Sequence, residues 1–179
     1  MTQVAVNYAG ALYELSLEEG LSADLLQQLQ VLQTSFAEEP AFVRLLAAPN
    51  ISKEERCNVL EESFRDRVHP YVLNFLKILT EKGYIRHFSD CCKAFENRYN
   101  TDNGILPVLA ETAVALTPDQ LGRLQEKLQT ITGKKVVLEN QVVPACLGGV
   151  RLRYDGTQVD GTVQGRLKAM GNLLQNTVL

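Results

Sequence analysis

Two aspartates near the C-terminus offer the first candidate chemistry in this chain, because paired carboxylates can act as general acid and general base. Asp155 and Asp160 flank a short segment, and Asp155 directly precedes Gly156. The Asp-Gly dipeptide favours a two-residue hairpin turn, whose positive φ angles glycine adopts without steric cost. We therefore predict that both aspartates serve turn formation and local capping and have no acid–base role.

The cysteines and histidines are the next candidates, as nucleophiles or metal ligands: Cys57, Cys91, Cys92, Cys146, His69 and His87. Cys146 has no histidine in its sequence neighbourhood to activate the thiol. The cysteines also lack the paired spacing of zinc sites, so no metal site and no cofactor are expected. Structural thiols in a reducing compartment are the prediction, with adjacent Cys91 and Cys92 not both facing one core. An enzyme that uses Cys146 and Asp160 is kept as an unfavoured alternative.

The composition and the absence of certain motifs exclude further classes of protein. The chain contains no GxxxxGK[ST] phosphate loop, and Gly148-Gly149 does not lead directly into a helix that could bind phosphate. A net charge of −3 in 179 residues argues against a nucleic-acid-binding protein, which normally carries a basic excess. No apolar run approaches the roughly 20 residues that span a bilayer, and the first residues do not resemble a signal peptide. We expect a cytosolic protein that reaches a membrane only through partners.

The first half of the chain predicts helices. Apolar residues recur at helical spacing in six segments, over about residues 2–19 and 85–99 and from residues 22, 40, 52 and 70. Their ends are marked by capping serines, first-turn prolines and terminal glycines: Ser22, Ser52, Pro40, Pro70, Gly20 and Gly83. Short helices with short links predict a compact antiparallel six-helix bundle.

A polar stretch, residues 100–104, separates this half from a segment with β character. We place the domain boundary there, giving a helical domain over 1–104 and a second domain over 105–179. The second domain is expected to contain a strand over 105–115, a helix from Thr117 to Gly133, and strands over 135–139, 150–154 and 157–160. Thr117 and Gln120 are expected to cap the start of that helix. A last helix beginning at Thr162 would carry Val163, Leu167, Met170 and Leu174 on one face. The fold class is therefore mainly α with a small C-terminal α+β domain.

The sequence over 142–167, VVPACLGGVRLRYDGTQVDGTVQGRL, resembles the C-terminal signature of the delta subunit of F-type ATP synthases. That family includes the mitochondrial oligomycin-sensitivity-conferring protein. The matching motif residues are Gly148, Gly149, Asp160, Gly161 and Thr162; the chain departs from the family pattern at Val143, where Asp is usual, and at Cys146. The segments YAGAL (8–12), FVRLLAAPNIS (42–52) and NFLKILTEKGYI (74–85) are similar to the family's helical domain.

The resemblance implies a non-catalytic stator subunit of a proton-translocating ATP synthase. In the family, the helical domain binds N-terminal segments of the alpha subunits, and the C-terminal domain holds the ends of the peripheral-stalk b subunits. The chain would then be one copy in a hetero-oligomeric complex at the cytoplasmic face of the bacterial plasma membrane, without inserting into the membrane. The resemblance does not decide whether the coupled ion is a proton or a sodium ion.

Six residues match the motifs of the family's alpha-binding surface: Tyr8, Ala9, Leu12, Asn74, Phe75 and Leu76. On the first helix, Tyr8 and Leu12 lie one turn apart, and Ala5 and Ala9 form a small-residue strip that could be the floor of a groove. Core packing of Leu12 and Phe75 is an equal alternative. The sequence thus predicts that Tyr8→Ala weakens alpha binding and that Ala9→Trp fills the groove of a folded protein.

A generic helix-binding adaptor, unrelated to ATP synthase, is the first rival interpretation. The GGVRLRY…VDGTV tract distinguishes the two, because a generic adaptor has no reason to carry it.

Overall fold

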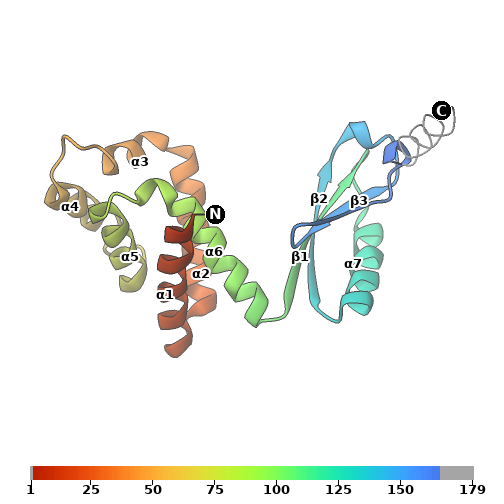
Figure 1. Ribbon diagram of the computed structural model, residues 1–179, viewed down its shortest axis with the longest axis horizontal. Coiled ribbons are helices and arrows are strands. Elements are labelled where there is room, and N and C mark those ends of the chain that lie inside the picture. The colour runs from red at the N-terminus through yellow and green to blue at the C-terminus, as the bar shows by residue number, and fades with distance from the viewer. Residues whose placement is uncertain (1, 166–179) are drawn as a thin grey trace, which may run out of the picture. The chain divides into compact units, whose positions relative to one another are not determined.

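The computed structural model describes residues 2–165, and the chain divides into two compact units, Met1–Tyr99 and Asn100–Leu179 (Figure 1). The mainly helical class with a small α+β part is confirmed. Each unit has its own apolar core. No helix in the part of the chain that the structure describes is long and apolar enough to cross a bilayer.

Helices make up the N-terminal unit. They are α1 (Gln3–Glu18), α2 (Ser22–Glu38), α3 (Pro40–Leu46), α4 (Lys53–Phe64), α5 (Pro70–Glu81), the 3-10 helix η1 (Ile85–His87) and α6 (Phe88–Asp102). The expected count of six is exceeded because residues 85–87 form their own 3-10 turn before α6. The capping box at Ser52 is confirmed: its Oγ accepts from the Glu55 amide at 3.1 Å while the Glu55 carboxylate accepts from the Ser52 amide. Ser22 is the first residue of α2 and does not cap it; its hydroxyl lies 3.0 Å from the Ser16 hydroxyl.

Gly10 of α1 lies against a side chain of α6. A Cβ placed on Gly10 would lie 2.8 Å from an Nη atom of Arg98. The Arg98 guanidinium also pairs with Glu14 at 3.0 Å and lies 5.8 Å from the centroid of the Tyr13 ring. In the bundle core, the rings of Tyr13 and Phe95 pack edge to face with their centroids 5.3 Å apart. The small residues of α1 therefore serve helix packing inside the unit.

The predicted polar break does not begin at residue 100. Helix α6 continues through Asn100, Thr101 and Asp102, and only Asn103 and Gly104 form a turn. None of the three helical residues is a glycine or proline, so none forces the helix to end. Gly104, with φ +61°, is the first residue that reverses the backbone.

The C-terminal unit is a four-stranded sheet with one described helix against it. Its elements are β1 (Ile105–Thr112), α7 (Pro118–Thr132), β2 (Lys135–Val142), the 3-10 helix η2 (Pro144–Cys146), β3 (Val150–Tyr154) and β4 (Thr157–Asp160). The strand order is β2-β1-β3-β4, with β1 and β2 parallel and the other pairs antiparallel. The parallel pair requires a crossover, and α7 provides it.

Two strand ends differ from the prediction. β1 stops at Thr112 because the Thr112 hydroxyl donates to the Val114 carbonyl at 2.7 Å and turns the chain, which leaves Val114 73% exposed. β2 extends three residues beyond the predicted end, to Val142, because each of its residues pairs in register with β1. The hairpin at Asp155-Gly156 is confirmed, with φ angles of 46° and 72°.

One face of the sheet holds the core of this unit. Leu106, Val108 and Val136 are buried there, and α7 lies along that face (Figure 1). Gln125 of α7 donates to the Val136 carbonyl at 3.0 Å and so fixes the helix over β2. α7 itself contains no fully buried residue. The last helix begins at Val163; Leu167, Met170 and Leu174 lie outside the described residues.

Candidate functional site

The glycines of the C-terminal motif meet in a corner where two backbone segments touch. Gly149 has φ +78°, and a Cβ there would lie 2.5 Å from the Gly161 carbonyl oxygen and 3.0 Å from the Thr162 Cα. Backbone hydrogen bonds join the segments on both sides of this contact: the Gly161 amide donates to Val150 at 3.0 Å and the Val163 amide to Gly148 at 3.0 Å. The structure thus brings together Gly148, Gly149, Gly161 and Thr162.

Asp160 completes the corner. Its Oδ1 accepts from the Thr162 amide at 2.9 Å and from the Thr162 hydroxyl at 2.6 Å. These bonds, together with the positive charge of Arg151, hold the pKa of the Asp160 carboxyl below its ordinary value. The Thr162 hydroxyl in turn accepts from the Gly165 amide at 3.0 Å and caps the helix that begins at Val163. The predicted capping roles of Asp160 and Thr162 are confirmed.

The other oxygen of Asp160 leads to an ion-pair cluster on the sheet face opposite α7. Arg151 donates to Asp160 Oδ2 from Nη2 at 3.3 Å and to Glu111 Oε2 from Nη1 at 3.1 Å. Arg153 Nη1 lies 3.2 Å from the second Glu111 oxygen. Glu111 and Asp160 raise the pKa of the Arg151 guanidinium above its ordinary value. The alternation of residues along β3 places both arginines on one face, but their partner Glu111 lies 40 positions before Arg151 and was not predicted.

The cysteines do not form a reactive site. Cys146 is fully buried in η2. Burial raises the pKa of the Cys91 thiol to about 11 and that of Cys92 further, and it also raises the pKa of Cys57, so these thiols stay protonated and unreactive. Cys91 and Cys92 are both buried in one core, at 1% and 3% exposure, so the prediction that they could not share it is wrong. Among the described residues no group of three or more His, Cys, Asp or Glu could hold a metal ion.

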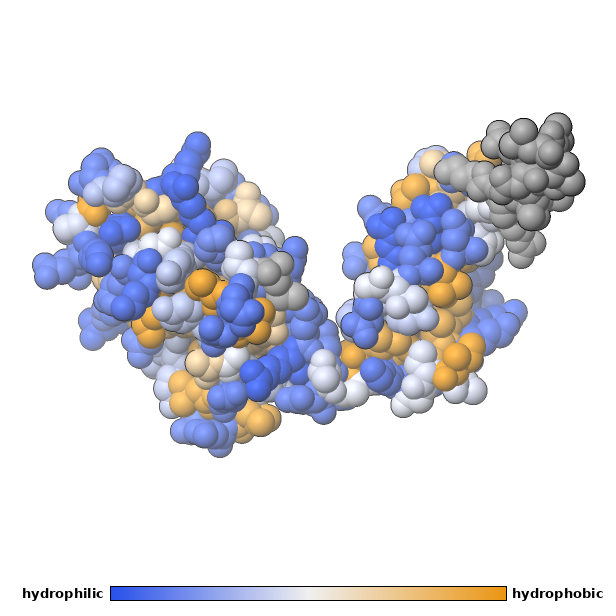
Figure 2. Space-filling model, in the orientation of Figure 1, coloured by the Kyte–Doolittle hydropathy of each residue, from blue (hydrophilic) through white to orange (hydrophobic). Residues whose placement is uncertain are grey.

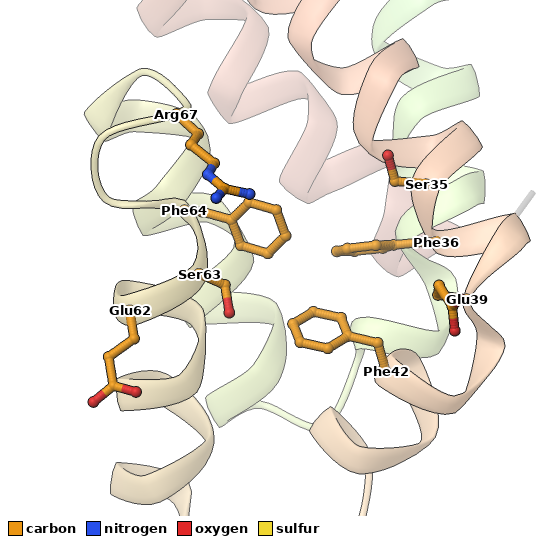
Figure 3. A pocket seen from close by; sticks show the side chains of 8 residues that line it. All are labelled: Ser35, Phe36, Glu39, Phe42, Glu62, Ser63, Phe64 and Arg67. Atoms are coloured by element: carbon orange, nitrogen blue, oxygen red, sulfur yellow. The ribbon is translucent and has the colours of Figure 1, made fainter.

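A hollow of about 500 Å³ opens beside the C-terminal end of α2 (Figure 3). Its floor is formed by Phe36, Phe42 and Phe64, whose ring centroids lie 5.7 to 6.1 Å apart. Figure 3 shows that the three phenyl side chains point toward one another with their rings tilted or edge-on, while the Glu62 side chain points away from them. The lining contains two serines but no histidine or cysteine, so this hollow lacks the nucleophile–base pair of an active site.

The six residues predicted to bind an alpha subunit differ in exposure. Ala9, Leu12, Phe75 and Leu76 are all buried in the bundle core. Asn74 is exposed, and Tyr8 is half-buried with its ring centroid 6.0 Å from that of Tyr84. The small-residue strip of Ala5 and Ala9 faces the core, so the predicted groove with Ala9 as its floor is wrong. Alanines at this spacing can pack either in a core or against a partner helix, and here they pack in the core of the bundle.

A different set of α1 residues reaches the surface. Val4, Tyr8, Ala11 and Leu15 recur at spacings of four, three and four along the helix, and none of them is fully buried. Leu15 is 36% exposed. We call these four residues the α1 surface; Figure 2 shows hydrophobic atoms in the region that α1 occupies in Figure 1. The helical spacing was visible in the sequence, but not the fact that this side faces outward.

A second apolar stripe lies on α7. Leu121, Leu124 and Leu128 are half-buried, and Ile131 is 81% exposed. These residues follow one another on one side of the helix, at spacings of three, four and three. We call them the α7 surface.

Comparison with known proteins gives a consistent result over the whole chain. The family described as "ATP synthase delta (OSCP) subunit" matches residues 4–174. The "ATP synthase subunit delta" of Alkaliphilus oremlandii is 32% identical over 98% of this chain and 98% of its own length. That of Clostridioides difficile is also 32% identical, over 98% of this chain and 97% of its own.

A solved structure is similar as well. A chain in the cryo-EM structure of the Toxoplasma gondii mitochondrial ATP synthase hexamer aligns with a TM-score of 0.77 and covers 97% of this chain and 98% of its own length. At 16% identity this likeness concerns the fold. Together with the family match, it leads to one assignment: the chain belongs to the ATP synthase delta (OSCP) subunit family.

Proposed function

We propose that this protein is a non-catalytic stator subunit of an F-type ATP synthase. It links the catalytic head to the peripheral stalk, so that proton-driven rotation is coupled to ATP synthesis. The observation that carries the proposal is the family match over residues 4–174. The division into two units, each with a half-exposed apolar stripe, suits a protein that holds two partners at once.

The α1 surface is the proposed site for the N-terminal segment of an alpha subunit. A row of half-exposed apolar side chains on one helix fits the apolar face of a second, amphipathic helix. Tyr8 lies in the middle of this row, and tyrosine serves an interface well because its ring is apolar while its hydroxyl tolerates water. Asn74 and the 42%-exposed Ile78, one turn apart on α5, add a polar and an apolar contact.

Tyr8→Ala should weaken binding of a synthetic alpha-subunit N-terminal peptide by about 1–3 kcal/mol, the range of an interface anchor. The bundle should stay folded, because the Tyr8 ring is only half-buried. Calorimetric titration measures the affinity, and circular dichroism checks the fold. The matched control is Asn7→Ala, an exposed neighbour outside the α1 surface, which should bind as the wild type does. Equal losses in both variants, or none in either, would place the site elsewhere.

The C-terminal unit is the proposed site for the ends of the peripheral-stalk b subunits, with contacts along the α7 surface and at the corner that follows β4. The core of the C-terminal unit is small: Leu128 packs against it, whereas Leu121 and Leu124 are half-buried and Ile131 is 81% exposed, so this helix still offers apolar area to a partner. The protein would act as one copy within the complex, at the cytoplasmic face of the bacterial plasma membrane, without entering the membrane.

The two rival functions have less support. A generic helix-binding adaptor would not explain a family match that extends from the first helix to the C-terminal motif. A cysteine-dependent enzyme would need an accessible Cys146, which is fully buried.

A further inference from the structure

The central strand of the sheet carries a carboxylate that the sheet nearly encloses. The Glu111 side chain is 6% exposed, yet it lies on β1, on the face opposite α7. Removing a carboxylate from water is unfavourable unless charged donors compensate it. Arg151 and Arg153 of β3 supply that compensation, one to each oxygen.

Strand register places Glu111 in a row with two other charged residues. Arg151 of β3 lies opposite Glu111 of β1, and Asp160 of β4 lies opposite Arg151. The Arg151 side chain is 18% exposed and donates to both neighbours at 3.1 and 3.3 Å. A forked guanidinium presents separate N–H groups to carboxylates on either side of it, whereas a lysine ammonium carries its three donors on one nitrogen. We call Glu111, Arg151 and Asp160 the Arg151 latch.

The latch extends to the start of the last helix. Asp160 binds Arg151 through one oxygen and Thr162 through the other, and Thr162 caps the helix. A Cβ on Gly165 would lie only 2.8 Å from the Asp160 carboxylate, so the first turn of the helix sits directly on this group. Hydrogen bonds thus run without interruption from the inner strand β1 to the helical turn that begins at Val163.

The element that the latch holds is otherwise the weakest in the sheet. β4 has four residues, all of them exposed, and it pairs on one side only. A short edge strand of this kind separates from its sheet more readily than a central strand does. The proposed b-subunit site includes the corner that β4 leads into, so the position of β4 decides the position of that contact.

We propose that Arg151 is a positioning residue for stalk binding: by joining Asp160 to Glu111, it fixes β4 and the corner in the orientation that the b subunits require. This inference rests on the proposed function, namely that the C-terminal unit holds the b subunits. The glycine corner sets the path of the backbone, and the Arg151 latch fixes that corner to the central strand.

The test uses the full chain, the soluble segment of the b subunits as the probe, and the alpha-subunit N-terminal peptide as an internal control. Arg151→Met should weaken b-segment binding about tenfold, since it removes three charged hydrogen bonds, two to Asp160 and one to Glu111. Alpha-peptide binding and the circular dichroism spectrum should stay unchanged. Arg153→Met is the matched control: it removes the other partner of Glu111 but has no contact with Asp160, so b-segment binding should change less than about twofold.

Asp160→Asn separates positioning from simple stabilisation. The asparagine Oδ1 can still accept from Thr162, but the charged contact with Arg151 is lost. It should weaken b-segment binding as Arg151→Met does, and the double variant should bind no more weakly than either single variant, as expected of two residues in one linkage. If Arg151→Met fails to fold, Arg151→Lys serves instead. Its b-segment affinity should fall about threefold or more, because a single ammonium group replaces the forked guanidinium.

The outcomes are distinct. Wild-type affinity in a folded Arg151→Met or Arg151→Lys protein would overturn the latch while leaving the stator role intact. Additive losses in the double variant would also overturn it. A wild-type chain that binds the alpha peptide but not the b segment would instead contradict the proposed function.

Discussion

Gly149→Ala is expected to destabilise the C-terminal unit by about 3 kcal/mol or more, among the largest effects of any single methyl group in this protein. Gly149 combines a φ of +78° with a Cβ position 2.5 Å from the Gly161 carbonyl oxygen. Both causes act on backbone atoms, so no side chain can move aside to relieve the clash. The glycine motif is therefore explained by the fold of the corner, whatever partner binds nearby.

Gly133→Ala separates the two causes. Gly133 ends α7 with a φ of +66°, but no atom lies within 4 Å of its Cβ position. Only the left-handed backbone is penalised there, and the expected loss is about 1 kcal/mol. Hydrogen exchange of the amides of β1 and β3 reports the C-terminal unit alone. If Gly149→Ala and Gly133→Ala lost similar amounts of stability, the two backbone segments of the corner would not be in contact.

Ala9→Trp is expected to destabilise the N-terminal unit by about 3 kcal/mol or more, and so to unfold much of it. Ala9 is 1% exposed and belongs to the same core as Ala5 and Tyr13. An indole has no space there without displacing neighbouring helices, because protein interiors are close-packed. Circular dichroism during thermal unfolding measures the effect.

Ala11→Trp is the matched variant, two residues further along the same helix. Ala11 is exposed and belongs to the α1 surface, so the bundle should stay folded. The indole would cover the proposed contact area, and calorimetric titration should detect little or no binding of the alpha-subunit peptide. A folded Ala9→Trp protein that fails to bind the peptide would instead restore the groove predicted from the sequence.

Local signals in the sequence predicted local structure well. The capping boxes Ser52/Glu55 and Thr117/Gln120 both form, as does the turn at Asp155-Gly156. Each depends on residues within four positions of one another, so the sequence contains the whole interaction. The corner was predicted in part for the same reason, since Asp160 and Thr162 are two residues apart.

Features that depend on distant contacts were not predictable in this way. The side of α1 that faces the core is decided by packing against other helices, such as that of Tyr13 against Phe95 of α6, and alanine spacing alone cannot reveal it. The pairing of Glu111 with Arg151 depends on β1 lying beside β3, which follows from the strand order. Helix α6 extends to Asp102 because polar residues favour a loop only weakly when no glycine or proline stops the helix.

One binding measurement tests the stator account most directly. Catalytic heads lacking the delta subunit are immobilised through a beta-subunit tag and exposed to the soluble b segment, with and without this protein. The account predicts that the b segment is retained only when the protein is present, because one chain binds the alpha subunits and the b subunits at the same time. Retention that does not depend on the protein, or displacement of the heads by the b segment, would contradict the account.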